Sequence, residues 1–321
     1  MRIVGSGALN VDFFYRVEDL TALSSLTKGL RPGEEVWGTR EEFERLREEL
    51  EKRGELLAVC GGGSAANTIY ALSRWGFETA FIGLLGQDQE ADLIVEEFQG
   101  VDLSRVLRRG KTACCLIILD QHQDRALFVA PHSEEEVLEQ WRPKTQKEEW
   151  LHLSSLVTTA GLSFHQRLRA NHAGPFSLDP GEIYASRGKT ILKGLFSGAE
   201  VLFLTEHELK LLAIDPKELL AYVKRLVIKK GRKGAEILGK GTGDVSAVPP
   251  SVWVDNTGAG DVFDAGFLAG LFLGLEELGA ARLAAHLASL SLRDYGRKGF
   301  PGREEFQNIL KGVQANDSRG S

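Results

Sequence analysis

Short apolar segments that alternate with longer helical stretches are the feature that most restricts the folds open to this chain. Each segment has three to five residues, and the intervals between them are long enough to hold a helix. Parallel strands need such crossover connections, so the alternation predicts an α/β fold with a mostly parallel sheet and helices on both faces. The segments are Trp150–Leu153, Phe176–Leu178, Val201–Leu204 and Arg225–Lys229.

The remaining elements are predicted from local patterns. Arg2–Leu9 is predicted to be a buried first strand, and Thr39–Arg53 a helix with one apolar stripe. Three glycines precede a helix over Ser64–Trp75, and Gly76 ends it. The other predicted elements are strands Phe13–Val17, Phe77–Leu84 and Ala235–Leu238, a hairpin of Thr112–Leu119 and Arg125–Ala130 around the polar turn Asp120–Asp124, and helices Gln89–Phe98, Asp261–Leu275, Ala280–Arg293 and one from Arg303.

Composition narrows the class of protein. A chain of 321 residues with 43% hydrophobic residues can bury a large core, and no low-complexity linker interrupts it, so we predict one domain over residues 1–321. The formal charge of -6 argues against a nucleic-acid partner, and no apolar run is long enough for a membrane span. We therefore expect a cytoplasmic protein. Its three cysteines lack metal-ligand spacing and are expected to be free and buried.

The run Asp255–Asp261 (DNTGAGD) is the strongest candidate for a functional site. It places small residues and a carboxylate where a tight turn enters an apolar helix. Backbone N–H groups at a helix start have no partners within the helix and can bind a phosphate group. An acid beside them, Asp261, can take a proton from an attacking hydroxyl. The alternative from the residues alone is that Asp261 only caps the helix.

Two other glycine motifs do not have the context their chemistry needs. Gly5-Ser6-Gly7 follows a predicted strand, but Asn10 stands where a dinucleotide-binding motif has its third glycine, and no helix follows. The stretch from Gly234 to Lys240 nearly matches a phosphate-binding loop, but Gly241 replaces the required hydroxyl residue. We interpret the second stretch as a hairpin turn.

Three segments follow one another along the chain: GSGALNVD after the first strand, GGGSAANTIYALSRWG, and DNTGAGDVFDAGFLAG near the C-terminus. In this order they resemble the ribokinase-like (PfkB) family of carbohydrate and nucleoside kinases. The resemblance implies a central, mostly parallel sheet flanked by helices, with a small β lid drawn from about 13–37 and 112–130. It also implies ATP-dependent transfer of a phosphoryl group to a hydroxymethyl group of a sugar or nucleoside.

The resemblance assigns roles to particular residues. Asp261 would be the catalytic base, and the amides around Gly258, Ala259 and Gly260 would form the anion hole. The acceptor would be bound by Asn10, Asp12, Gly62, Gly63 and Asn67. Polar side chains suit a polyol, and glycines allow a ligand to approach the backbone closely.

The nucleotide-binding positions implied by the resemblance are Gly231, Gly234 and His286. Glu208 matches the glutamate that helps to order Mg²⁺ through water, although Thr205 replaces the asparagine usual in that motif. Many relatives are also helped by a monovalent cation, to whose site Asp255 is a candidate contributor. Asn256, where threonine or proline is common, is a further departure from the family pattern.

The acceptor is left open between a nucleoside and a simple sugar. The insertion Thr39–Arg53 and the sequence GGSAANT resemble the adenosine-kinase-like branch of the family. Arg16 and Arg125, in contrast, would suit a phosphosugar acceptor. Lid strands have exposed edges, so a monomer and a lid-mediated homodimer are both open. The alternative of another class is a non-catalytic sugar- or nucleotide-binding regulator on the same fold, which the presence of Asp261 disfavours.

Overall fold

The larger of two sheets has nine strands in the computed structural model, which describes residues 1–20, 30, 35–120 and 125–320. The strand order is β14-β13-β12-β11-β10-β9-β1-β5-β6, and the strands from β12 to β6 are parallel neighbours. The added strands β13 and β14 are antiparallel. Their bounds are β1 (Ile3–Ser6), β5 (Thr79–Leu85), β6 (Val101–Arg108), β9 (Trp150–Ser154), β10 (Phe176–Asp179), β11 (Val201–Thr205), β12 (Leu226–Lys229), β13 (Ala235–Leu238) and β14 (Gly243–Val245).

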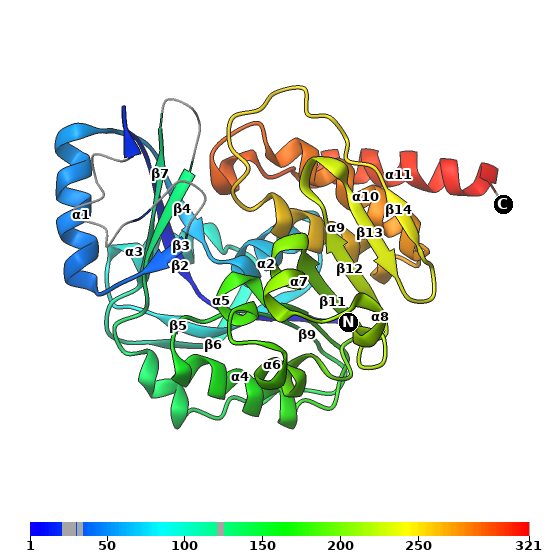
Figure 1. Ribbon diagram of the computed structural model, residues 1–321, viewed down its shortest axis with the longest axis horizontal. Coiled ribbons are helices and arrows are strands. Elements are labelled where there is room, and N and C mark those ends of the chain that lie inside the picture. The colour runs from blue at the N-terminus through cyan, green and yellow to red at the C-terminus, as the bar shows by residue number, and fades with distance from the viewer. Residues whose placement is uncertain (21–29, 31–34, 121–124, 321) are drawn as a thin grey trace.

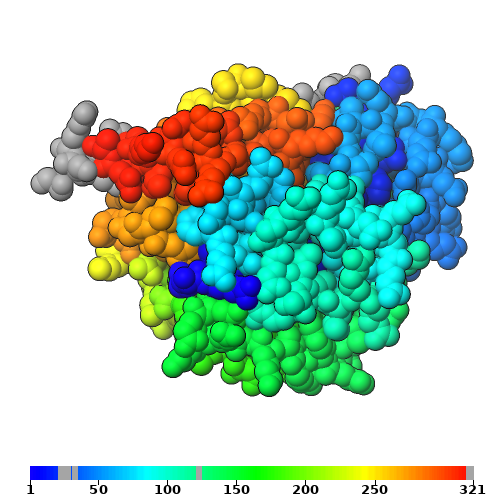
Figure 2. Space-filling view, turned by 180° about the vertical axis from the view of Figure 1, so that it is seen from behind, coloured from blue at the N-terminus to red at the C-terminus, as the bar shows by residue number. Residues whose placement is uncertain are grey.

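Helices cover both faces of this sheet, as the alternation predicts (Figure 1). Successive residues of each strand enter different cores: Ile3 and Phe81 join one, and Val4 and Ile82 join the other. The first core includes α2 (Ser64–Trp75), α3 (Gln89–Glu97), α9 (Ala259–Phe272), α10 (Glu277–Ser291) and α11 (Arg303–Gly320). The second includes α4 (Thr159–Asn171), α5 (Gly181–Ala185), α6 (Lys189–Phe196), α7 (Glu206–Leu212) and α8 (Pro216–Leu219). Figure 2 shows the reverse side, where α11 lies along α10 and α2.

A second, five-stranded sheet has the order β3-β8-β7-β2-β4. It takes strands from both segments predicted for the lid and also from Glu55–Gly62, which we had not predicted as a strand. Helix α1 (Arg40–Arg53) packs on this sheet through Phe43, Leu46 and Leu50. Residues 121–124 of the predicted turn lie outside the described residues. The strands are β2 (Asn10–Arg16), β3 (Glu35–Trp37), β4 (Glu55–Gly62), β7 (Ala113–Leu119) and β8 (Arg125–Ala130).

Local signals explain where the elements nearest the site begin and end. Helix α2 starts after Gly63, which has φ 94°, and ends at Gly76 in the left-handed conformation. The stretch that nearly matches a phosphate-binding loop forms the β13–β14 hairpin, so its interpretation as a turn is confirmed. All three cysteines are free and buried, as expected. Among the described helices, none has the length and apolar character that a membrane crossing requires.

Candidate active site

Asp261 lies in the first turn of α9 and is tied to α2 by hydrogen bonds to both carboxylate oxygens. Ser64 Oγ donates to Oδ1 at 2.7 Å, and Asn67 Nδ2 donates to Oδ2 at 2.8 Å. The hydroxyl of Thr68 donates to the main-chain oxygen of Asp261 at 3.2 Å. The carboxylate is therefore held in one orientation, toward the segment that carries the predicted acceptor residues.

The environment of Asp261 tunes its proton affinity. Burial raises the pKa of this carboxyl from 3.8 to about 6, while the hydrogen bonds from Asn67 and Ser64 oppose the rise. The negative charge of Asp179 adds to the upward shift. At neutral pH the group is mainly ionised, and its pKa lies close enough to the working pH for efficient proton transfer. A plain helix cap would not need this combination of burial and directed hydrogen bonds.

Backbone amides form an anion site beside Asp261. Gly258 precedes α9 with φ 78°, and a Cβ there would lie 2.8 Å from the ring of Phe300, so the position requires glycine. The amide of Ala259 makes a long bond of 3.3 Å to the oxygen of Asn256. Within the described part of the chain, the amides of Gly258, Gly260 and Asp261 have no hydrogen-bond partner. They lie at the positive end of a helix dipole, which favours an anion.

The predicted acceptor residues come together where β2 meets β4. Asn10 pairs with Gly62 across these strands, and Asn10 Nδ2 donates to Asp12 Oδ1. A Cβ on Gly62 would lie 2.2 Å from Asp12 Oδ2, and one on Gly63 would lie 2.1 Å from the oxygen of Ala8. Gly62 is thus needed to seat the Asp12 carboxyl against the backbone, and Gly63 to allow the close approach of the Ala8 carbonyl. Burial raises the pKa of Asp12 to about 8, so this group is mainly neutral at pH 7 and can donate a hydrogen bond.

Arg297 is a site residue that the sequence analysis missed. Its Nε donates to Asn67 Oδ1 at 2.9 Å, and its Nη2 donates to the Gly62 oxygen at 3.2 Å. Its Nη1 donates to Glu97 Oε2 at 2.8 Å, and the guanidinium lies 4.9 Å from the centre of the Tyr70 ring and 4.8 Å from that of Phe98. Because Arg297 can only donate, it orients the Asn67 amide so that its NH₂ group faces Asp261. The sequence around Arg297 (YGRKGF) carries no pattern that indicates this role.

A cavity of about 1200 Å³ opens on the other side of the anion site. Gly231 and Gly234 line it, together with Ala259 and Gly260; Asp261 itself is not part of the lining. One set of lining residues is cationic (Lys210, Lys229, Lys230 and Arg232), and another is apolar (Val248, Pro249, Pro250, Trp253, Phe263 and Leu292). This division suits a ligand with a charged chain and a flat apolar ring system.

The other predicted ligand positions differ in how the structure places them. His286 is exposed on α10 and does not line the cavity, so the structure does not bring it together with the other predicted residues. Glu208 is buried, and it forms a capping box with Thr205 at the start of α7. Burial and the charge of Asp179 raise the pKa of Glu208 to about 7. Both carboxylate oxygens of Asp255 accept hydrogen bonds, from Thr257 Oγ1 and from the amide of Gly296.

The described residues contain no group of three or more His, Cys, Asp or Glu side chains that could hold a metal ion. Glu208 Oε2 accepts from the Thr205 amide, and none of the described residues donates to Oε1. One oxygen of a buried carboxylate fits the water-mediated contact that the family resemblance implies for Mg²⁺.

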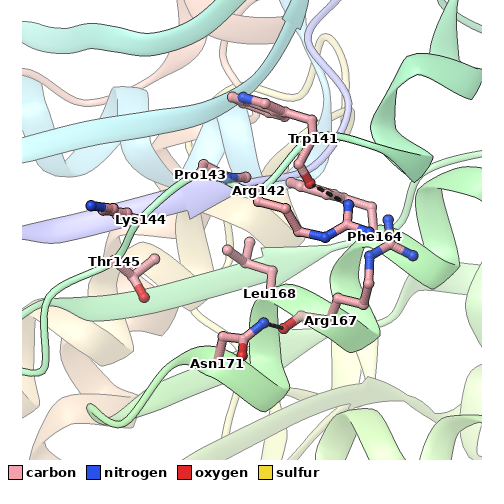
Figure 3. Close-up of a pocket in the computed structure, with 9 residues that line it drawn as sticks. All are labelled: Trp141, Arg142, Pro143, Lys144, Thr145, Phe164, Arg167, Leu168 and Asn171. Atoms are coloured by element: carbon pink, nitrogen blue, oxygen red, sulfur yellow. Dashed lines mark hydrogen bonds between the residues drawn. The ribbon is translucent and has the colours of Figure 1, made fainter.

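A second cavity, of about 290 Å³, lies between residues 141–145 and α4 and contains none of the predicted site residues (Figure 3). Its arginines bind main-chain oxygens: Arg142 donates to the oxygens of Glu139 and Trp141, and Arg167 donates to that of Leu138. The Arg142 bonds are local to this loop, and the Arg167 bond joins α4 to the residue Leu138 that precedes it.

Comparisons with known proteins agree with this geometry. Residues 35–300 match the family described as pfkB family carbohydrate kinase. The chain is 30% identical over 245 residues to an uncharacterized sugar kinase of Archaeoglobus fulgidus, covering 72% of this chain and 98% of that protein. It is also 30% identical over 245 residues to a fructokinase of Escherichia coli, covering 69% of this chain and 80% of that protein.

Solved structures show the same fold. The nucleoside kinase of Methanocaldococcus jannaschii, described as an archaeal member of the ribokinase family, superimposes with a TM-score of 0.76 at 19% identity, over 97% of this chain and 98% of that one. The family match spans most of the chain and includes both the glycine segment before α2 and the start of α9. This chain therefore belongs to the pfkB family of carbohydrate kinases.

Proposed function

We propose that this protein transfers the γ-phosphoryl group of ATP to a hydroxymethyl group of a sugar or nucleoside. One observation carries the proposal: the Asp261 carboxylate is fixed beside unpartnered amides, between the acceptor residues and the large cavity. A proton acceptor, an anion site and two flanking binding regions are the parts that in-line phosphoryl transfer needs.

In the proposed reaction, the acceptor hydroxyl lies against Asp261. The acceptor oxygen forms a bond to the γ-phosphorus while the bond from that phosphorus to the bridging oxygen of ADP breaks. The hydroxyl proton passes to the Asp261 carboxylate, whose pKa of about 6 makes it an effective acceptor at neutral pH. The amides of Gly258, Gly260 and Asp261 stabilise the negative charge on the transferred group.

ATP fits the large cavity by charge and by size. Its phosphates would extend from Gly260 past the cationic residues, and its base would lie against the apolar residues near Trp253. Arg232 stacks on the Trp253 ring at 4.5 Å, which extends this flat surface. When Mg²⁺ is bound to the phosphates, it neutralises part of their charge, and Glu208 is the residue proposed to contact it through water.

We propose that the five-stranded sheet covers the acceptor. Beyond Asn10 and Asp12, the same face of this sheet carries the apolar side chains of Phe14, Cys115 and Ile117. Arg125 donates to Asn256 Oδ1 and Thr257 Oγ1, and Arg16 is paired with Glu55 and Tyr295. Because both arginines already have protein partners, an uncharged sugar or nucleoside is favoured over a phosphosugar.

The test is ATP consumption with a panel of hexoses, pentoses and nucleosides, using the native protein and Asp261→Asn. We expect turnover that depends on one acceptor class and is nearly lost in the variant. No acceptor-dependent turnover across the panel, with ATP and Mg²⁺ present, would contradict the proposed function and favour a binding protein.

The edges of the five-stranded sheet suggest how two copies could associate. Trp37 on β3 and Leu56 on β4 are 60% and 49% exposed, and these strands form the two edges. Exposed edge strands with apolar side chains favour pairing with another chain. We propose a homodimer formed through this sheet; sedimentation of the native protein and of Leu56→Glu tests it, and a native monomer would contradict it.

A further inference from the structure

Lys229 is a buried lysine next to the anion site, and the sequence analysis assigned it no role. It ends β12, at the edge of the sheet where parallel strands present their carboxyl ends, and its side chain is 11% exposed. Nζ lies 2.7 Å from Asp179 Oδ2 and 3.1 Å from Asp264 Oδ1. Ligands of open α/β sheets bind at this edge, so a charged side chain there is well placed to meet one.

The position of Nζ relative to the anion site is set by α9. A Cβ placed on Gly260 would lie 3.4 Å from Lys229 Nζ, so the ammonium lies beside the first turn of that helix. Lys229 also lines the large cavity, together with Ala259 and Gly260. The amides and the ammonium therefore border the same end of the cavity.

The hydrogen bonding of Lys229 leaves one donor available. An ammonium has three N–H groups, and Asp179 and Asp264 accept from two of them. No third hydrogen-bond acceptor is found among the described residues; the Phe203 ring lies 5.8 Å from Nζ. Asp264 is fully buried, and burial raises the pKa of its carboxyl well above the usual range, whereas at Asp179 burial is outweighed by the nearby Lys229 charge and by hydrogen bonds, which lower the pKa. The third N–H of Lys229 therefore remains for a ligand in the cavity that this side chain lines.

The four acidic groups around Lys229 are Asp179, Asp264, Glu208 and Asp261. They come from three elements, β10, α7 and α9. Burying a charge is costly unless it is paired, so this arrangement both retains the cation and fixes its position.

We propose that Lys229 is a catalytic residue that donates a hydrogen bond to the phosphate chain of the phosphoryl donor, and that Asp179 and Asp264 are its positioning residues. The inference rests on the proposed function. Lys229 stabilises charge on the phosphate oxygens as the bond to the γ-phosphorus breaks; the proton balance remains that described for Asp261. A purely structural ion pair would not discriminate between a nucleoside and its phosphates.

The experiment compares the affinities for adenosine and for a non-hydrolysable ATP analogue, measured by calorimetry, in native protein and in Lys229→Met. We expect the analogue to lose about 10–100-fold in affinity, as for a lost hydrogen bond to a charged group, while adenosine changes little. Lys224→Met is the matched control, because Lys224 precedes the same strand and pairs with Glu200 away from the cavity. An equal loss for both ligands, or no loss, would overturn the inference.

A second variant covers the case in which Lys229→Met does not fold because Asp179 is left unpaired. Lys229→Met/Asp179→Asn is compared with Asp179→Asn alone, since the neutral asparagine removes the unpaired charge. The ratio of the affinity for the ATP analogue to the affinity for adenosine should again fall only in the variant that lacks the lysine. If the native protein binds the analogue but turns over no acceptor, the proposed function fails and with it the catalytic role of Lys229, while the ratio still decides whether Lys229 binds the phosphate chain.

Discussion

Asn67 donates a 2.8 Å hydrogen bond to Asp261, and the orientation of that amide is fixed from behind by Arg297. The three side chains come from α2, α9 and the segment after α10, so the site depends on how these elements pack. The arrangement links the proposed proton acceptor to a buried cation that also holds the Gly62 carbonyl.

Asp261→Asn removes the proposed base while keeping side-chain size. Loss of a positioned base lowers rates by about 10²–10⁴-fold, so kcat should fall by that amount. Coupled detection of ADP measures it. Binding of an ATP analogue should change little, because Asp261 does not line the cavity; an unchanged kcat would show that another group takes the proton.

The activity of the native enzyme should fall as the pH is lowered through about 6. Asp261 acts only when ionised, and burial raises its pKa to about 6, so activity is lost as pH decreases through that value. Ser64→Ala removes a hydrogen bond that favours the ionised form, and the acidic limb should move to higher pH. An identical limb in both proteins would contradict the role of this hydrogen bond.

Asp12 makes stability depend on pH in the opposite sense to a salt-bridged acid. Its pKa is about 8 in the folded protein against 3.8 for an ordinary aspartate, so the folded protein holds a proton that the unfolded chain has lost between these two values, and the stabilisation is gone once pH has risen through about 8. The contribution of Asp12 to the melting temperature should therefore decline from about pH 4 to 8 and level off above it. Asp12→Asn, which stays neutral, should show a smaller decline over the same range.

Arg297→Met should weaken both the fold and acceptor binding. Removing the buried guanidinium leaves the oxygens of Asn67 and Gly62 without this donor. It also leaves Glu97, whose side chain is 23% exposed, with only the Gly61 amide among the described residues, so we expect a loss of about 3 kcal/mol in the free energy of unfolding. The Asn67 amide would also lose its fixed orientation, so acceptor KM should rise. Urea unfolding and acceptor kinetics measure the two effects. Compared with Arg297→Met, Arg297→Lys should regain much of the lost stability but little of the lost acceptor affinity, as judged by KM.

Gly62→Ala tests the close approach of Asp12 to the backbone. The added Cβ would lie 2.2 Å from Asp12 Oδ2, so the carboxyl must move out of its position. Acceptor KM should rise at least about 10-fold, the effect of losing one good hydrogen bond, while affinity for an ATP analogue stays the same. A matching loss of ATP affinity would indicate general misfolding instead.

Local sequence determined much of the fold and part of the site. The limits of α2 follow from Gly63 and Gly76, and the alternation of apolar segments predicted the parallel sheet, because such signals act within a few residues. The DNTGAGD run likewise predicted, from neighbouring residues alone, that the Asp261 carboxylate lies beside backbone amides at the start of a helix. Strand β6 (Val101–Arg108) was missed because, as an edge strand, it carries mixed polar and apolar residues without a continuous apolar run.

Only the tertiary structure decided which distant residues complete the site. Arg297 meets Asn67 across 230 positions, and Lys229 meets Asp179 across 50 and Asp264 across 35. A periodic pattern states which face of an element is buried, but not which side chain of another element it will meet. The pKa values of Asp12 and Asp261 likewise depend on burial and on charges brought in by packing, so composition and motif alone could not supply them.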